Sequence, residues 1–223
     1  NQYKRTRSYF QNSEMAATGL PSEAELKLLE PLRDKLPERV FTEEYQPPVS
    51  DGTGRPRENL RTAQTLLKKA GYEVRNGQLF NPEGKPVKFE FLLYSPAFER
   101  VVLPFSRNLK ALGISADVIR VDESQYLQRV RNFNFDMIVG GWGQSSSPGN
   151  EQRDFWSSKA ADRPSSRNYA GIKDPAIDSL VKTLISAKDR EALVTSSRAL
   201  DRALQWGFYV IPNWGMDYHR FAY

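Results

Sequence analysis

The sequence predicts an α/β fold in which an open mixed sheet with a parallel β-α-β-α-β core is flanked by helices. Over residues 87–140, segments rich in β-forming residues alternate with segments whose apolar residues recur at helical spacing. The connections between these strands are long enough for crossover helices, and such connections force neighbouring strands to pair in parallel. The last third of the chain is mostly helical in pattern, which supplies helices to flank the sheet.

The beginning of the chain predicts little regular structure apart from one helix. Residues 1–20 are polar and aromatic, which predicts an irregular lead-in. Ser22 suits the N-cap of a helix that runs to about Arg33, because Glu25 stands at the capping-box position. Residues 40–56 contain adjacent prolines and two closely spaced glycines, and this composition predicts a loop.

A helix over residues 57–70 and a β-hairpin over residues 72–80 are predicted next. The helix is expected to end at Gly71, and its apolar face consists of Leu60, Ala63, Leu67 and Ala70. Asn76-Gly77 separates two short strand-like runs, and this dipeptide is the strongest short-range signal for a hairpin turn.

Three strands and two connecting helices make up the predicted parallel core. The strands are expected over residues 87–94, 114–121 and 135–140, and the helices over residues 97–112 and 122–132. Pro104 is a misfit inside the first helix, where proline costs about 3 kcal/mol, so we expect a kink or a helix that begins near it. Asp122 is expected to cap the second helix, with Leu127 and Val130 facing inward.

Two long helices and a final strand are predicted in the last third. Asp174 is an N-cap followed by proline at the first helical position, and the buried stripe of this helix consists of Ile177, Leu180, Leu184 and Ile185. A second helix is expected from about Asp189 to Trp206. Residues 208–214 predict a strand, which Pro212 confines to an edge position or a strand end.

Composition excludes several classes of function. The 223 residues include no cysteine, which excludes disulfides, thiolate metal sites and cysteine nucleophiles. A single histidine, His219, excludes histidine-rich metal clusters. The net charge of +5 comes from interleaved basic and acidic residues, which predicts a mixed solvated surface rather than a nucleic-acid-binding face. No apolar run approaches the roughly 18–20 residues of a membrane-spanning helix, and no dinucleotide fingerprint or P-loop implies a cofactor.

Candidate ligand-binding residues follow from the parallel core, because ligands of open parallel sheets bind outside the carboxyl ends of the strands. Tyr94 and Ser95 follow the first strand, and the third strand leads into a glycine-rich and polar loop with Gly141, Trp142, Gln144, Ser145 and Ser146. Glycine allows close approach of a ligand, and tryptophan offers a flat face with one N–H donor. The alternative is that Trp142 packs under the sheet edge and the glycines form an ordinary turn.

A second candidate segment is the loop that contains Asn168 and Tyr169. It precedes the Asp174 cap, so these side chains either face a cleft or have a plain role in the loop. The sequence leaves both alternatives open.

The residues argue against catalysis. Acidic residues are too scattered to indicate an acid/base pair, and the serine run over residues 145–147 lacks the G-x-S-x-G elbow of a hydrolase. A serine-dependent peptidase or amidase would depend on His219 as its base. We therefore expect a binding module without catalysis, with that enzyme class or a structural interaction domain without a small ligand as the alternatives.

The order of several short motifs resembles the family 5 extracellular solute-binding proteins, which deliver oligopeptides, dipeptides or nickel to ATP-binding-cassette importers. The motifs are Asp-x-x-x-x-Gly-Trp from Asp136 to Trp142, Asn168-Tyr169-x-Gly171, Asp174-Pro175-x-x-Asp178, Val210-Ile211-Pro212 and Leu-x-x-x-Gly-Ile-x-x-x-Val from Leu109 to Val118. The wording GGWGQSSSPGNEQ, with FQNSEMAATGLPS near the start, resembles the YejA-type oligopeptide-binding branch of that family.

The resemblance implies a periplasmic-binding-protein type II-like lobe. We expect residues 1–223 to form a single lobe, the second of a two-lobed periplasmic protein whose signal peptide lies outside this chain. Residues 1–56 would be a lead-in near the hinge, 57–215 the core, and 216–223 an exit toward the missing first lobe. The implied partners are an oligopeptide, that first lobe and the permease subunits of the importer, with no nucleic acid, no metal, no cofactor, and contact with the membrane only through the importer.

One position departs from the family pattern. In peptide-binding members, an aspartate three residues after the tryptophan of the Gly-Trp motif pairs with the ligand's α-amine. Ser145 stands at that position here, with Gln144 beside it. The resemblance therefore implies that neutral polar groups replace a charged anchor, and that ligand choice differs at this point.

Overall fold

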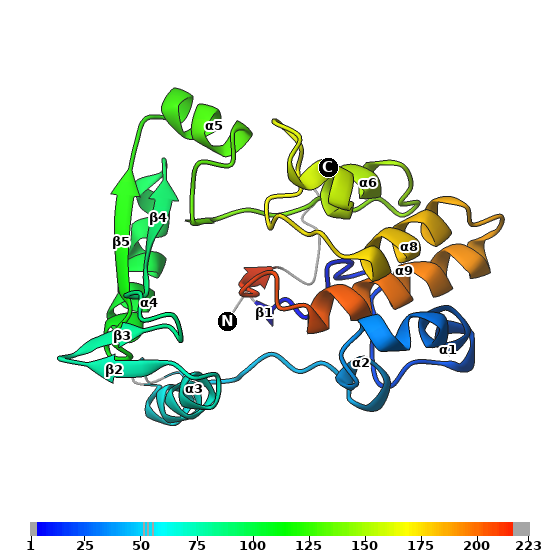
Figure 1. Ribbon diagram of the computed structural model, residues 1–223. Coiled ribbons are helices and arrows are strands. Elements are labelled where there is room, and N and C mark those ends of the chain that lie inside the picture. Colours follow the sequence, from blue (N-terminus) through cyan, green and yellow to red (C-terminus); the bar gives the residue numbers. More distant parts are fainter. Residues whose placement is uncertain (1–3, 51, 53, 55, 216–223) are drawn as a thin grey trace. The chain divides into compact units, whose positions relative to one another are not determined.

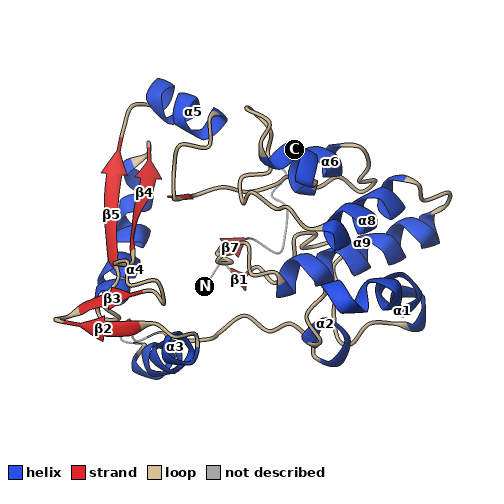
Figure 2. Ribbon diagram, in the orientation of Figure 1, coloured by secondary structure: helices blue, strands red, loops and turns tan. Residues whose placement is uncertain are grey.

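The chain consists of two compact units. The computed structural model describes residues 4–50, 52, 54 and 56–215. Its contacts group Asn1–Pro47 with Trp142–Tyr223, here called the helical unit, and separate Pro48–Gly141, here called the sheet unit (Figures 1 and 2). The core expected over residues 57–215 is thus divided after Gly141, and its second part groups with the lead-in. That residues 1–223 form a single lobe of a longer protein stays a prediction.

Three parallel strands form the sheet of the sheet unit, as predicted. They are β4 (Lys88–Leu93), β5 (Ser115–Arg120) and β6 (Met137–Ile138), in the order β5-β4-β6. Figure 1 shows β4 and β5 side by side. The third strand is shorter than expected. Before it, the carboxylate of Asp136 accepts a hydrogen bond from the backbone N–H of Glu90 at 2.9 Å, so a side chain takes a place that a strand carbonyl would hold.

Two helices cross between these strands. A 3₁₀ turn, η2 (Pro96–Phe98), leads into α4 (Glu99–Lys110), which runs through Pro104, so the alternative that the helix begins near this proline is wrong. Asp122 caps α5 (Glu123–Arg131) by accepting from the N–H of Gln125 at 2.9 Å. Leu127 was expected to face inward, but its side chain is 42% exposed, and no residue of α5 is buried.

The first helix and the hairpin of the sheet unit also form as predicted. The helix is α3 (Arg57–Lys69), and β2 (Glu73–Arg75) pairs with β3 (Gln78–Phe80) around Asn76 and Gly77, both at positive φ. Leu79 of the hairpin is buried in a hydrophobic cluster of the sheet unit, whose other members include Leu60, Ala63, Leu67, Leu112 and Ile114. Gly113 has φ +81°, and a Cβ there would lie 2.8 Å from the backbone nitrogen of Leu79, so only glycine fits.

The helical unit packs short and long helices around one large core. Its elements are α1 (Glu23–Leu29), η1 (Glu30–Lys35), α2 (Arg39–Thr42), α6 (Glu151–Trp156), α7 (Ser158–Ala161), α8 (Pro175–Ile185) and α9 (Arg190–Trp206). The caps predicted at Ser22 and Asp174 accept from Glu25 and Ala176 backbone N–H groups. Figure 1 shows α8 and α9 side by side, and their leucines fill the core with Phe10, Met15, Leu29 and Trp156.

The strand predicted over residues 208–214 is wrong. Only β7 (Trp214–Gly215) is extended and paired, and its antiparallel partner is β1 (Lys4–Arg5) near the start of the chain. Phe208 has φ +51°, which breaks an extended run, and Pro212 offers no N–H to a neighbouring strand.

The irregular lead-in is fixed to α9 by two adjacent buried polar side chains. Asp201 is fully buried and accepts hydrogen bonds from the hydroxyl of Ser8 at 2.7 Å and from the N–H groups of Tyr9 and Ala17, each at 2.8 Å. Arg202 forms a buried ion pair with Glu25 at 3.0 Å. Its guanidinium also donates to the backbone carbonyl of Gly19 in the lead-in. These bonds join the start of the chain to its last long helix.

Candidate functional site

Trp142 anchors the loop of residues 142–150, here called the Trp142 loop, to the helical unit. Its ring lies 4.7 Å from that of Trp156, 5.8 Å from that of Tyr169 and 6.1 Å from that of Tyr9, measured between centroids. Its indole N–H donates to the carbonyl oxygen of Arg167 at 2.8 Å. Trp142 therefore packs on an aromatic cluster of the helical unit, and its N–H is used within that unit. Its ring remains partly exposed.

A series of hydrogen bonds from buried residues orients the side-chain amide of Gln144. The indole N–H of Trp156 donates to Gln152 Oε1 at 2.8 Å, and Gln152 Nε2 donates to Gln144 Oε1 at 2.7 Å. Both Trp156 and Gln152 are 0% exposed. The amide nitrogen of Gln144 is covered and has no acceptor among the described residues. This nitrogen is a donor of the loop that the protein's described part does not use.

The two candidate serines lie at the exposed turn of the Trp142 loop. Ser145 Oγ accepts from the N–H of Ser147 at 3.1 Å, so this hydroxyl shapes the turn. The carbonyl of Ser146 accepts from the guanidinium of Arg190, and the same guanidinium pairs with Glu14 of the lead-in. The lead-in and the first residue of α9 thus hold the loop from one side.

The two glycines that flank Trp142 leave space where a side chain would stand. Gly141 and Gly143 are exposed, neither has a positive φ, and a Cβ added to either would meet nothing within 4 Å. These glycines are therefore not required by packing or by backbone strain among the described residues. Their lack of a side chain fits a segment that a ligand approaches closely.

Asn168 and Tyr169 differ in their surroundings. Asn168 is 0% exposed, and its side-chain amide donates to the carbonyls of Ser157 and Ile172 and accepts from the N–H of Ile172. Because both ends of the amide are used, the geometry favours the loop role for this residue. Tyr169 is partly exposed beside Trp142 and stays a candidate for ligand contact.

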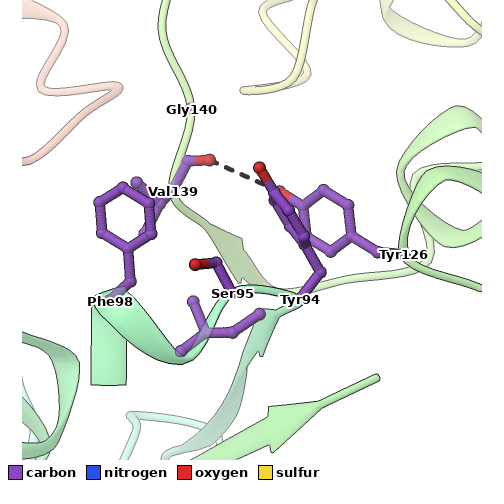
Figure 3. A pocket seen from close by; sticks show the side chains of 7 residues that line it. Tyr94, Ser95, Phe98, Tyr126, Val139 and Gly140 are labelled. Carbon is purple, nitrogen blue, oxygen red and sulfur yellow. Dashed lines mark hydrogen bonds between the residues drawn. The ribbon is translucent and has the colours of Figure 1, made fainter. Parts of the chain in front are cut away.

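Tyr94 and Ser95 line a pocket of about 260 Å³ in the sheet unit, at the carboxyl ends of the parallel strands (Figure 3). Tyr94 is 46% exposed, and its ring lies 4.8 Å from that of Tyr126. Phe98 and Val139 form an apolar side of the pocket, as Figure 3 shows. The pocket is lined by rings, aliphatic groups and hydroxyls without a charged side chain, which suits an uncharged group.

Sequence reasoning missed four residues of these sites. Gln152 and Arg190 position the Trp142 loop, and Phe98 and Tyr126 complete the pocket. Gln152 lies within the quoted motif GGWGQSSSPGNEQ, so the motif itself was a signal for it. The pairing of Arg190 with residues 44 and 176 positions away carried no local signal.

The described residues show no group of three or more His, Cys, Asp or Glu side chains that could hold a metal ion. Within the same part of the chain, no helix is long and apolar enough to cross a membrane. His219, the base that a serine mechanism would need, lies outside the described residues.

Comparison with known proteins agrees with this architecture. "Uncharacterized protein y4wM" of Sinorhizobium fredii is 52% identical over 213 residues, which cover 95% of this chain and 32% of that protein. "Probable peptide-binding protein YejA" of Agrobacterium fabrum is 47% identical over 213 residues, again 95% of this chain and 35% of that protein. The chain therefore spans about a third of the length of these curated relatives.

The fold is found in solved structures as well. The oligopeptide-binding protein AppA from Bacillus subtilis, solved in complex with a nonapeptide, matches with a TM-score of 0.64 and 19% identity, over 96% of this chain and 46% of that chain. This match confirms the predicted type II periplasmic-binding-protein architecture. The model of the bacterial extracellular solute-binding proteins, family 5 Middle, matches residues 33–163, more than half of the chain. The chain belongs to the family 5 bacterial extracellular solute-binding proteins.

Proposed function

We propose that this chain is the ligand-binding part of a periplasmic protein that delivers oligopeptides to an ATP-binding-cassette importer, without catalysis. The carrying observation is the Trp142 loop, where an anchored ring, an open glycine backbone and an oriented amide donor lie together. Peptides suit such a surface because they present carbonyl oxygens, N–H groups and side chains along an extended backbone.

The named relatives support the choice of peptides. One is described as a probable peptide-binding protein, and a structure of the same fold holds a nonapeptide. In a longer, two-lobed protein, closure of the lobes around a peptide would supply the affinity, and the importer's permease subunits would receive it. The pocket beside Tyr94 then serves as an uncharged subsite of the sheet unit.

The serines of the Trp142 loop support binding rather than hydrolysis. Ser145 Oγ accepts a backbone N–H within its own turn, and the buried carboxylate of Asp201 is occupied by the lead-in. No described contact brings a base to the serine hydroxyls, as a serine nucleophile would need.

Mass spectrometry of compounds released from the purified longer protein tests this proposal. We expect oligopeptides to be released intact, and calorimetry with the identified peptides to give stoichiometric binding. Time-dependent cleavage of the peptides by the protein would instead support the peptidase alternative. Release of no peptide, together with no binding from a random tetrapeptide pool, would refute the proposal.

A further inference from the structure

The direction of the Gln144 amide is set by a group that can only donate. An indole N–H has no acceptor capacity, so the atom of Gln152 that lies 2.8 Å from Trp156 Nε1 must be the oxygen. The nitrogen of Gln152 then faces Gln144 at 2.7 Å, so Gln144 must present its own oxygen to it. One buried indole thus fixes the orientation of two side-chain amides in series.

The remaining end of the series is the Gln144 amide nitrogen. It carries two hydrogens, is enclosed, and has no acceptor among the described residues. Leaving a buried donor unpaired is unfavourable, so this nitrogen favours a bound group that accepts a hydrogen bond. The residue as a whole is only partly buried, and its loop neighbours Ser145 and Ser146 are exposed, so the nitrogen lies just beneath the surface of the loop.

The carboxylate of Glu151, which lies beside these two amides, determines which kind of ligand acceptor is favoured. Gln152 Nε2 also donates to Glu151 Oε1 at 3.1 Å, and the N–H of Gly149 donates to the same oxygen at 2.7 Å. Burial alone would raise the pKa of Glu151, but the hydrogen bonds from Gly149, from Gln152 and from its own backbone together lower the pKa, so the side chain is ionised at neutral pH. An anionic ligand group would be repelled here, whereas a neutral carbonyl would not.

We propose that Gln144 recognises a neutral carbonyl oxygen of the ligand, and that Gln152 is the positioning residue that turns the amide donor of Gln144 toward it. The inference rests on the proposed peptide-binding function and adds the chemistry of one contact. The carbonyl belongs either to the peptide backbone or to an acyl group on the peptide's N-terminus. Both sources present the same acceptor.

Isosteric substitutions separate positioning from packing. Gln144→Glu keeps an oxygen for Gln152 but replaces the donor by an acceptor. In its ionised form, Gln152→Glu still accepts from Trp156 and its second oxygen attracts the nitrogen of Gln144, so the Gln144 amide turns over and presents oxygen to the ligand. Because the second oxygen also lies near Glu151, binding is measured at a pH at which the new carboxyl is ionised. The matched control is Gln128→Glu, which adds the same charge at an exposed position of α5 in the sheet unit.

The experiment uses the longer protein, a random tetrapeptide pool with free amines, and the same pool after N-acetylation. Retained peptides are quantified by mass spectrometry, and folding is checked by circular dichroism. We expect Gln144→Glu and Gln152→Glu each to lower affinity at least tenfold, and Gln128→Glu to change it less than twofold. An equal loss for both pools assigns the carbonyl to the backbone, and a larger loss for the acetylated pool assigns it to the N-terminal acyl group.

Two outcomes would contradict the proposed roles of Gln144 and Gln152 while leaving the proposed peptide-binding function intact. If the wild-type protein retains peptides and the folded Gln144→Glu protein retains them equally well, no donor of Gln144 is used. If Gln144→Glu loses affinity while the folded Gln152→Glu protein does not, Gln152 does not position the amide. If the wild-type protein retains neither pool, the proposed function itself fails.

Discussion

Trp142 and Trp156 lie with their ring centroids 4.7 Å apart, and each uses its indole N–H within the protein. Trp142 donates to the carbonyl of Arg167, and Trp156 donates to Gln152. The pair therefore acts on the Trp142 loop in two ways. Trp142 fixes the position of the start of the loop, and Trp156, through Gln152, fixes the orientation of the Gln144 side-chain amide.

Replacing Trp142 by alanine is expected to destabilise the protein as well as weaken binding. The change removes partly buried ring contacts and leaves the Arg167 carbonyl without its donor, which together cost roughly 3 kcal/mol of unfolding free energy. Denaturant unfolding of Trp142→Ala beside Trp142→Phe measures this. The phenylalanine variant should recover more than half of the loss, and wild-type stability in the alanine variant would contradict the anchoring role.

Replacing Arg190 by glutamine is expected to loosen the Trp142 loop with little effect on stability. The Arg190–Glu14 pair is about half exposed, so its loss costs less than about 1 kcal/mol, but the Ser146 carbonyl loses its guanidinium partner. Hydrogen exchange of the backbone amides of residues 145–147 and 149 should accelerate several-fold.

Arg198→Gln is the matched control for that experiment. Arg198 lies on the same helix and donates to the backbone carbonyl of Glu14 at 2.8 Å. Equal exchange in the loops of both variants would show that the Ser146 contact does not hold the loop.

Gly143→Ala is expected to leave the fold unchanged and to weaken peptide binding. The added methyl meets nothing within 4 Å and the backbone has no positive φ, so thermal unfolding should shift by less than about 1 °C. A ligand that lies against this backbone would meet the methyl, and calorimetry should show at least a threefold loss of affinity. Undiminished affinity in Gly143→Ala, and again in Gly143→Val, would place the ligand elsewhere.

The stability of the helical unit is expected to fall as the pH rises from 4 to 7. Burial raises the pKa of Asp201 to about 7, although hydrogen bonds from Ala17, Ser8 and Tyr9 act to lower it. Because the folded state then holds a proton that the unfolded state has released, this stabilisation is complete below about pH 4 and lost as the pH passes 7. Over this window the free energy of unfolding should drop by a few kcal/mol.

Denaturant unfolding at pH 5 and pH 8 tests that dependence. Asp201→Asn should be less stable than wild type, because an amide nitrogen would face backbone N–H donors, but it should lack this component of the pH dependence. The same pH dependence in the variant and in the wild type would assign the effect to other groups.

Local signals in the sequence were sufficient for much of the fold. Ser22, Asp122 and Asp174 cap helices as predicted, and Asn76-Gly77 turns the hairpin, because each of these features depends on neighbouring backbone atoms. The parallel pairing of β4, β5 and β6 was also predictable, because the lengths of the crossovers dictate it.

The remaining features depend on contacts between distant residues. No residue type near Phe208 indicates that its backbone is left-handed, and this conformation interrupts the predicted strand. Asn168 is of a residue type common in binding sites, yet its side-chain amide bonds to the backbone of Ile172 within its own loop. Arg190 and Asp201 bond to residues of the lead-in that lie 176 to 193 positions away in the chain, beyond the reach of periodicity or capping rules.

The bonds from Asp201 and Arg202 to the lead-in also set an order of assembly. The sheet unit is an insertion between two segments that complete each other, and its contacts lie within one continuous stretch of chain. During synthesis, Ser8 and Glu25 emerge long before their partners on α9 exist. The sheet unit is therefore expected to fold while the ribosome is still translating, whereas the helical unit closes only after α9 has been made. Because its contacts join distant parts of the chain, we expect this closure to be the slower of the two steps.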